Sequence, residues 1–217
     1  MLRKLLKKEL MLCLHPTAFL MLLLTGLLLT PNYPYTIMYF YLTLGIFFIC
    51  LGGRENADIT FTMTLPVAKR DIVAGRMLLA VLLELIQLLL AALLIPLRQR
   101  ILSGANAAGM DANLALLGEG FLFYGVFQLV FFPAWYRNTN RVGLSFIKSS
   151  VALFLLTGAD IVLSYALPFW RDVLDTPDPQ NLGTKVVFLL VCLLFYLAAT
   201  WAALRISRRR FERQDIR

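Results

Sequence analysis

The sequence has few of the residues from which enzymes build active sites. Its 217 residues include a single histidine, His15, and three cysteines, and no two cysteines form a CxxC pair. A zinc site would therefore lack ligands. A serine nucleophile would depend on a histidine next to Pro16, at the edge of an apolar segment, and no HExxH, GxSxG or paired-glutamate motif occurs. We therefore predict no catalytic residue and no metal site, and the chain is not expected to be an enzyme.

Charged residues are also scarce. They make up 16% of the chain, whereas hydrophobic residues make up 59%; a soluble domain carries about 25% charged residues. Several apolar runs approach the roughly 20 residues that a helix needs to cross a bilayer. The cysteines, Cys13, Cys50 and Cys192, fall within these runs and are interpreted as small buried hydrophobic side chains. The composition therefore predicts a single all-α integral membrane domain over residues 1–217.

The apolar runs and the basic residues together predict a topology. Of the 21 lysines and arginines, 17 fall at the N-terminus, in alternate connections or in the basic tail, residues 205–217. This bias places both termini in the cytoplasm by the positive-inside rule. The net charge of +8 is thus attributed to orientation and to contact with anionic membrane lipids, and not to nucleic acid. Six transmembrane helices are predicted, at residues 15–30, 34–51, 77–97, 114–133, 143–168 and 185–204.

The first 14 residues have the pattern of an amphipathic helix that lies in the membrane interface. Pro16 follows and is expected to bend the chain, because the residue before a proline resists helical dihedral angles. Apolar residues recur at helical spacing, and basic residues occupy the other side: Leu2, Leu5, Leu6 and Leu10 against Arg3, Lys4, Lys7 and Lys8.

Residues 52–76 form a charged loop between the second and third spans, and most of it reads RENADITFTMTLPVAKRDIVAGR. Arg54, Glu55 and Asp58 are expected to form a charged knot at the membrane surface. Such a segment can simply be a solvated inside loop, or it can present its charges to a partner. The spacing alone leaves both interpretations open.

A short surface helix is predicted within this loop. Thr64 is a candidate N-cap, and Pro66 suits the first turn of the helix that would follow. Gly75 would end this helix or let it bend into the third span.

Ionisable residues inside the spans indicate either packing or a polar path. Glu84 shares a stripe with Gln87 on the third span, Gln128 lies on a similar stripe of the fourth, and Glu119 and Asp160 belong to the fourth and fifth. Polar side chains can hydrogen-bond between helices, or they can line a translocation path, and both remain open. Glu119 and Asp160 fall in the outer third of their spans and Glu84 towards the inner half, so a single three-carboxylate site is not expected.

The loop also resembles a known family. RENADITFTMTLPVAKRDIVAGR is similar to the loop of ABC-2-type transporter permeases, in which an R-E-N/K-x-D element precedes an LPVsKkdIV segment. The basic amphipathic start, the LTPNYPY turn and six spans with both ends inside fit the same family. The resemblance is closest to the small permeases of bacterial peptide exporters, such as the phenol-soluble-modulin exporter.

This resemblance implies an exporter subunit in the bacterial cell membrane that works with partners. The first 14 residues would be the elbow helix of the family, and two copies or two related permeases would pair around the path of an amphipathic or apolar peptide. The segment between spans five and six is short, so the re-entrant gate found there in many members would be reduced. The family's coupling helix, which docks into a cytoplasmic ABC ATPase, would match Leu65, Pro66, Val67, Ala68, Lys69, Arg70, Asp71 and Ile72.

The chain has no phosphate-binding GxxxxGK[ST] motif. It would therefore hold no cofactor, and ATP and Mg²⁺ would be bound by the partner ATPase. The alternatives are a six-span solute-binding subunit of an ATP-driven importer, which would need a compact polar pocket such as Glu119 and Asp160 could form, and an immunity protein without transport.

Overall fold

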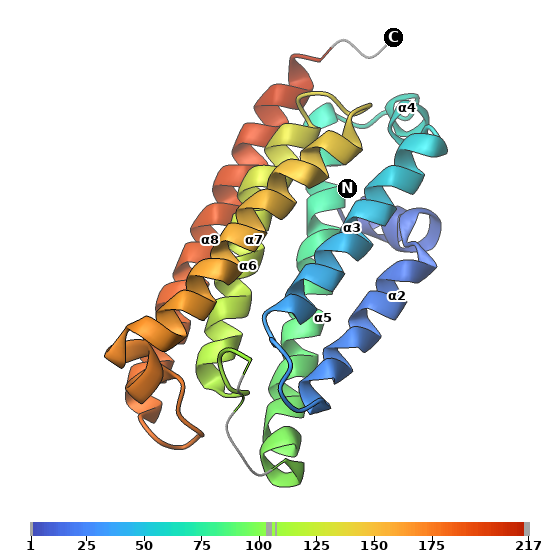
Figure 1. Cartoon of the computed structure of the whole chain (residues 1–217). Coiled ribbons are helices and arrows are strands. Elements are labelled where there is room, and N and C mark those ends of the chain that lie inside the picture. Colours follow the sequence, from blue (N-terminus) through green and yellow to red (C-terminus); the bar gives the residue numbers. More distant parts are fainter. Residues whose placement is uncertain (1, 103–105, 107, 215–217) are drawn as a thin grey trace.

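The protein is a bundle of long helices (Figure 1). The computed structural model describes residues 2–102, 106 and 108–214, and these contain helices and connections but no strand, which confirms the predicted all-α class. Residues 215–217 of the predicted basic tail lie outside the described residues. The elements are α1 Leu2–Lys8, η1 Glu9–Cys13, α2 Pro16–Leu23, η2 Leu24–Leu29, α3 Ile37–Glu55, α4 Asp58–Met63, α5 Lys69–Ile101, α6 Leu114–Trp135, α7 Val142–Ala166, η3 Trp170–Leu174 and α8 Leu182–Glu212.

Five of these helices, α3, α5, α6, α7 and α8, are long and apolar enough to cross a membrane. They correspond to the second to sixth predicted spans, although α5 begins at Lys69 and α8 runs from Leu182 to Glu212, well beyond the predicted ends. The first predicted span is the exception. Residues Arg3–Cys13 and Pro16–Leu29 pass the same test as a pair, but an angle of 87° separates them, so the described residues contain up to six spans if this bent pair counts as one.

The bend lies where Pro16 predicts it. His15, the residue before the proline, has extended dihedral angles (φ −81°, ψ 140°), and its Nδ1 accepts a hydrogen bond of 3.2 Å from the Thr17 backbone N–H. The proline disfavours a helical conformation for His15, and the imidazole then satisfies one of the free N–H groups of the new helix. The single histidine is thus a helix cap.

The amphipathic pattern of the N-terminus holds only for its first turns. Leu5 is buried, but Leu10, which was predicted on the same side, is 38% exposed, and Glu9 is buried in its place. Glu9 lies four residues after Leu5 and therefore on the same face of the helix. Leu10 falls at the edge of that face, so a carboxylate faces the protein in its place.

The helices form two groups that contact each other through α5 and through α3, which packs against α7 (Figure 1). In one group α6 packs against α7 and α8; in the other α2 packs against α3, and α5 touches α3, α6 and α8. The packing is tight at Gly120 of α6, where an added Cβ would lie 2.6 Å from Leu88 of α5 and 2.6 Å from Tyr39 of α3. Small residues permit such close contacts between membrane helices.

Both described ends of the chain lie at one end of the bundle, which we call the α4 end. Lys8 donates to Thr62 of α4 over 2.8 Å, and Lys69 at the start of α5 donates to the carbonyl of Gln214 over 2.8 Å. At the opposite end η3 is the one helical turn between α7 and α8. The reduced segment expected there is therefore a single five-residue turn within the described chain.

Candidate functional site

The predicted surface helix beginning at Thr64 and Pro66 is wrong. The helix in this loop is α4, Asp58–Met63, which ends at Thr64, and α5 then starts at Lys69 and continues past Gly75 without a break. The hydroxyl of Thr64 donates back to the Phe61 carbonyl over 2.8 Å and thus helps to close α4 instead of capping a new helix. Gly75 has a different use, because an added Cβ would lie 3.3 Å from the Leu5 side chain of α1.

The eight residues proposed to dock an ATPase differ in how exposed their side chains are. Those whose side chains are exposed are Leu65, Pro66, Ala68 and Arg70. Ile72 is only 4% exposed and Val67 packs against the core, so these two side chains serve the chain's own packing. Asp71 is half-buried, and the Lys69 ammonium lies over the Phe211 ring, 5.9 Å from its centre. The exposed part is therefore a turn between two helices, followed by the first turn of α5.

The predicted charged knot is also corrected. Arg54 and Glu55 face each other at 3.8 Å on an exposed surface, and Arg54 donates to the Asn140 carbonyl over 3.2 Å. Asp58 turns away from them. Its Oδ1 atom lies 2.7 Å from the Lys8 ammonium, and its Oδ2 atom lies 2.6 Å from the Arg76 guanidinium.

Arg76 is the centre of a buried ion-pair network that the sequence analysis missed. Its side chain is 4% exposed and contacts Glu9 at 2.6 Å, Asp58 at 2.6 Å and the Ile49 carbonyl at 3.2 Å. Lys8 completes the network through Glu9 at 3.0 Å. The network joins η1, α3, α4 and α5. Glu9 is the only acid among the first 14 residues, and that isolated carboxylate was the available signal.

Three atoms of this region are close enough to suggest a metal site. The ligand atoms of Glu9, Cys13 and Asp58 lie within 4.8 Å of one another. However, both carboxylates already contact the cationic side chains of Lys8 and Arg76. A metal cation would have to displace these partners against their repulsion, so the cluster is interpreted as an ion-pair network.

A second polar cluster lies inside the bundle around Glu84. The Oε2 atom of Glu84 accepts hydrogen bonds from Gln128 at 2.5 Å and from the Tyr196 hydroxyl at 2.7 Å. Gln87 accepts from the Tyr124 hydroxyl and donates to the Met38 carbonyl over 3.0 Å. All these groups are fully or almost fully enclosed, and the contacts link α3, α5, α6 and α8. The stripes of α5 and α6 therefore face each other in the interior.

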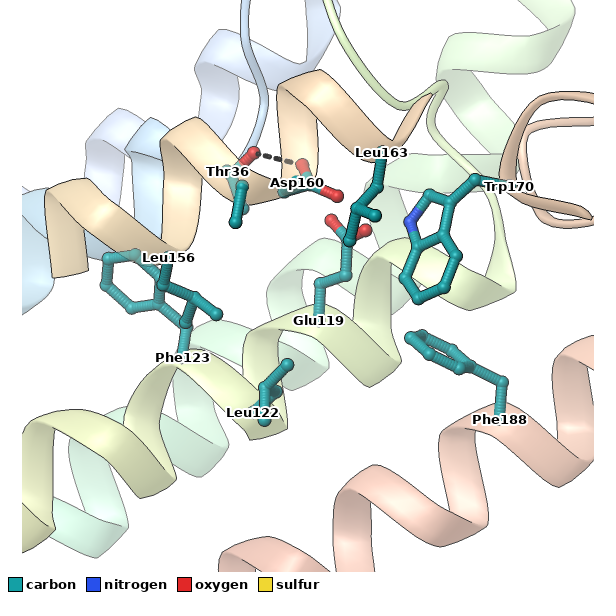
Figure 2. A pocket seen from close by; sticks show the side chains of 10 residues that line it. Thr36, Glu119, Leu122, Phe123, Leu156, Asp160, Leu163, Trp170 and Phe188 are labelled. Atoms are coloured by element: carbon teal, nitrogen blue, oxygen red, sulfur yellow. Dashed lines mark hydrogen bonds between the residues drawn. The ribbon is translucent and has the colours of Figure 1, made fainter. Parts of the chain in front are cut away.

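The third cluster is a pocket towards the opposite end. Figure 2 shows Glu119 and Asp160 facing each other across it. The Thr36 hydroxyl donates to Asp160 over 3.4 Å. The cavity has a volume of about 60 Å³, and most of its wall is apolar. As the depths in the spans predict, Glu119 and Asp160 are together, and Glu84 belongs to a different cluster.

Comparison with known proteins identifies the family. A family model described as ABC-2 family transporter protein matches residues 4–211. The chain belongs to the ABC-2 transporter family. No curated protein and no solved structure matches the chain.

Membership of the ABC-2 family confirms the coarser part of the sequence interpretation. The chain is a multi-pass membrane protein, as its five to six apolar helices also indicate. ABC-2 permeases are non-catalytic subunits that work with an ABC ATPase, so the family implies such a partner. The match covers the α4 end, the Glu84 cluster and the pocket alike.

Proposed function

We propose that this chain is the permease subunit of an ATP-driven exporter in the bacterial cell membrane, with both termini in the cytoplasm. The observation that carries the proposal is the ABC-2 family match over residues 4–211. The GxxxxGK[ST] motif is absent from the sequence, which supports the view that ATP and Mg²⁺ are bound by a separate ATPase.

The ATPase would dock at the α4 end. Phe61 and Leu65 expose 57% and 41% of their surface there, beside the exposed Pro66 and Arg70. Exposed apolar side chains bordered by charge are typical of interaction surfaces. In this proposal the turn between α4 and α5 takes the role that the coupling helix has in related permeases.

Motion of the ATPase would reach the bundle through α5. This helix is continuous from Lys69 to Ile101, so a displacement at its first turn moves the whole span. The Arg76 network ties α1, in the role of an elbow helix, and α4 to the same helix. These contacts support a rigid-body movement of the kind seen in many switching proteins.

A second copy or a related permease would complete the path. The most apolar stretches of α7 and α8 are each 22% buried, against 67% for α6. Their uncovered faces are available to lipid and to a partner subunit, and a two-fold pair is the commonest assembly.

Polar residues in the interior are proposed to line the path. The Glu84 cluster and the Glu119–Asp160 pocket would contribute to this lining at two different depths in the membrane. Buried ionisable groups in membrane proteins often mark such paths. The variant Glu84→Gln keeps the shape of the side chain. Export reduced at least tenfold would support the path, whereas unchanged export would leave the cluster as helix packing.

The cargo is proposed to be an amphipathic or apolar peptide, by resemblance to small peptide-exporter permeases such as the phenol-soluble-modulin exporter. A solute-binding importer subunit is the second candidate, and the pocket between Glu119 and Asp160 favours it. Transport into inside-out vesicles would indicate export, and transport into right-side-out vesicles would indicate import.

Docking can be tested with paired variants. Leu65→Glu/Arg70→Glu changes two exposed side chains of the turn and of α5, and it should reduce co-purification of the ATPase at least tenfold and remove stimulation of ATP hydrolysis. Arg171→Glu, an exposed arginine at the opposite end, is the control. Full binding by the double variant would refute the docking surface.

A further inference from the structure

The Glu119–Asp160 pocket has the features of a binding site. It is lined by residues of α6, α7, η3 and α8 and by the residue that precedes α3, and Glu119 and Asp160 are 5% and 8% exposed. Figure 2 shows both carboxylates pointing into the space between α6 and α7. The lining residues are Thr36, Glu119, Leu122, Phe123, Leu156, Ala159, Asp160, Leu163, Trp170 and Phe188.

Several polar atoms of this pocket lack a hydrogen-bond partner within the described chain. Both carboxylate oxygens of Glu119, Oδ1 of Asp160 and the indole N–H of Trp170 are buried without a hydrogen bond. The carboxylate of Glu84 differs, because its Oε2 accepts two hydrogen bonds. Burying an unpaired carboxylate is strongly unfavourable, and two that share a site add mutual repulsion. The pair therefore calls for a positive group between the carboxylates or for a shared proton.

The described residues supply no such cation. None of those that line the pocket is basic. Lys185, on α8, is turned to Asp178 at 2.9 Å, and Arg171 is paired with Asp172 at 2.8 Å. A positive group must therefore come from a ligand.

The wall indicates which kind of cation fits. The wall contains three aromatic side chains, Phe123, Trp170 and Phe188. Figure 2 shows the Trp170 ring nearest to the carboxylates, with Phe188 beyond it and Phe123 beside Leu156, and aromatic faces attract organic cations. A hard metal ion such as Ca²⁺ requires about 6–8 oxygen ligands, which two carboxylates and the Thr36 hydroxyl do not provide. The cavity of about 60 Å³ exceeds several-fold the roughly 10–15 Å³ of comparable volume that one water needs.

We propose that this pocket binds a protonated primary amine carried on an apolar chain. The ammonium group donates hydrogen bonds to Glu119 and Asp160, and the attached methylene groups contact the aromatic rings. If the chain exports peptides, the site would take an amino group of the cargo; this last step rests on the proposed function, whereas amine binding does not.

Binding can be measured on the purified full-length protein in lipid nanodiscs, with n-hexylammonium chloride as the probe and 1-hexanol as its uncharged match. Calorimetry should show saturable binding of the ammonium and at least tenfold weaker binding of the alcohol. Glu119→Gln and Asp160→Asn should each weaken ammonium binding at least tenfold. Asp172→Asn, which changes an exposed acid of the neighbouring η3, should stay within twofold of the wild type.

Three results would overturn the site: no saturable binding, equal binding of the alcohol, or unchanged binding by both carboxylate variants. The first result, together with higher thermal stability of Glu119→Gln, would indicate a shared proton in place of a ligand. Trp170→Leu provides a test that keeps both carboxylates, and it should weaken ammonium binding several-fold. Amine binding without ATP-driven transport would refute the proposed function alone, and transport without amine binding would refute the site alone.

Discussion

The Nε atom of Arg76 lies 2.6 Å from Oε2 of Glu9, and both side chains are almost fully buried. The pair connects α5 to the segment that follows α1, and Asp58 extends it to α4 at 2.6 Å. Gly53 of α3 leaves room for the guanidinium, because an added Cβ would lie 3.1 Å from Nη1. Four elements at the α4 end thus meet on one arginine.

Removing either partner should destabilise the protein. Glu9→Gln leaves Arg76 with Asp58 as its one ion-pair partner among the described residues, and Arg76→Gln leaves Glu9 with Lys8. The free energy of unfolding should fall by up to about 3–5 kcal/mol. Arg54→Gln is the matched control, because its ion pair with Glu55 is exposed and long and should contribute less than about 1 kcal/mol. Thermal unfolding in detergent measures the difference; equal midpoints for Arg76→Gln and Arg54→Gln would contradict the network.

The stability of the protein should also depend on the size of the side chain at position 120, because Gly120 lies in a close contact between helices. An added methyl group would meet Leu88 and Tyr39 at 2.6 Å, and overpacking of this kind costs about 1–3 kcal/mol. Gly158→Ala in α7 is the control, since no atom lies within 4 Å of its added Cβ, and replacing a helical glycine by alanine should stabilise by up to about 1 kcal/mol. The two variants should move the unfolding midpoint in opposite directions, and a shared direction would refute the packing at Gly120.

The spans could be predicted from the sequence because the bilayer imposes a length and a composition on each of them. The bend at Pro16 was predictable for a similar reason, since the proline restricts a single residue. The position of each residue along its span was enough to predict that Glu119 and Asp160 lie at a similar depth. It was not enough to show that neither carboxylate has a cation nearby, which depends on where the α8 residue Lys185 points.

The structure of the α4 end was less predictable because the local sequence there is compatible with two different structures. The Thr64 hydroxyl can cap a following helix or bond back to the preceding turn, and tertiary packing selects the second. Glu9 shares the buried helix face of Leu5, four residues before it, but its partner Arg76 lies on α5, and a contact between distant helices depends on tertiary packing.

The hydroxyl of Tyr196 should contribute to stability through Glu84. Tyr196→Phe removes the donor that lies 2.7 Å from Oε2 and leaves the buried carboxylate with Gln128. Loss of a partner of a buried polar group costs about 1–3 kcal/mol, and more when the group is charged. Glu84→Gln/Tyr196→Phe should lose less than the sum of the two single variants, as in a double-mutant cycle for contacting residues. Strict additivity in thermal unfolding would show that the two side chains do not interact.

Asp175 should give the protein a pH-dependent stability. Burial raises the pKa of Asp175 from 3.8 to about 6, and the neighbouring Asp111 carboxylate acts in the same direction, although the Asp111 backbone N–H, which donates to Asp175 over 2.6 Å, opposes both. The folded state therefore holds this proton more tightly than the unfolded state. The contribution to stability is complete below pH about 4 and is lost as the pH rises through about 6.

Asp175→Asn keeps an acceptor for the Asp111 N–H and does not titrate. Its unfolding midpoint relative to the wild type should therefore rise between pH 4 and pH 7. Asp172→Asn should show the opposite trend, because a hydrogen bond from Arg171 lowers the pKa of Asp172, and the stability from this pair is present at high pH and lost as the pH falls. The effect should be small, since both side chains are exposed. Parallel midpoints of wild type and Asp175→Asn across this range would show that Asp175 is not the titrating group.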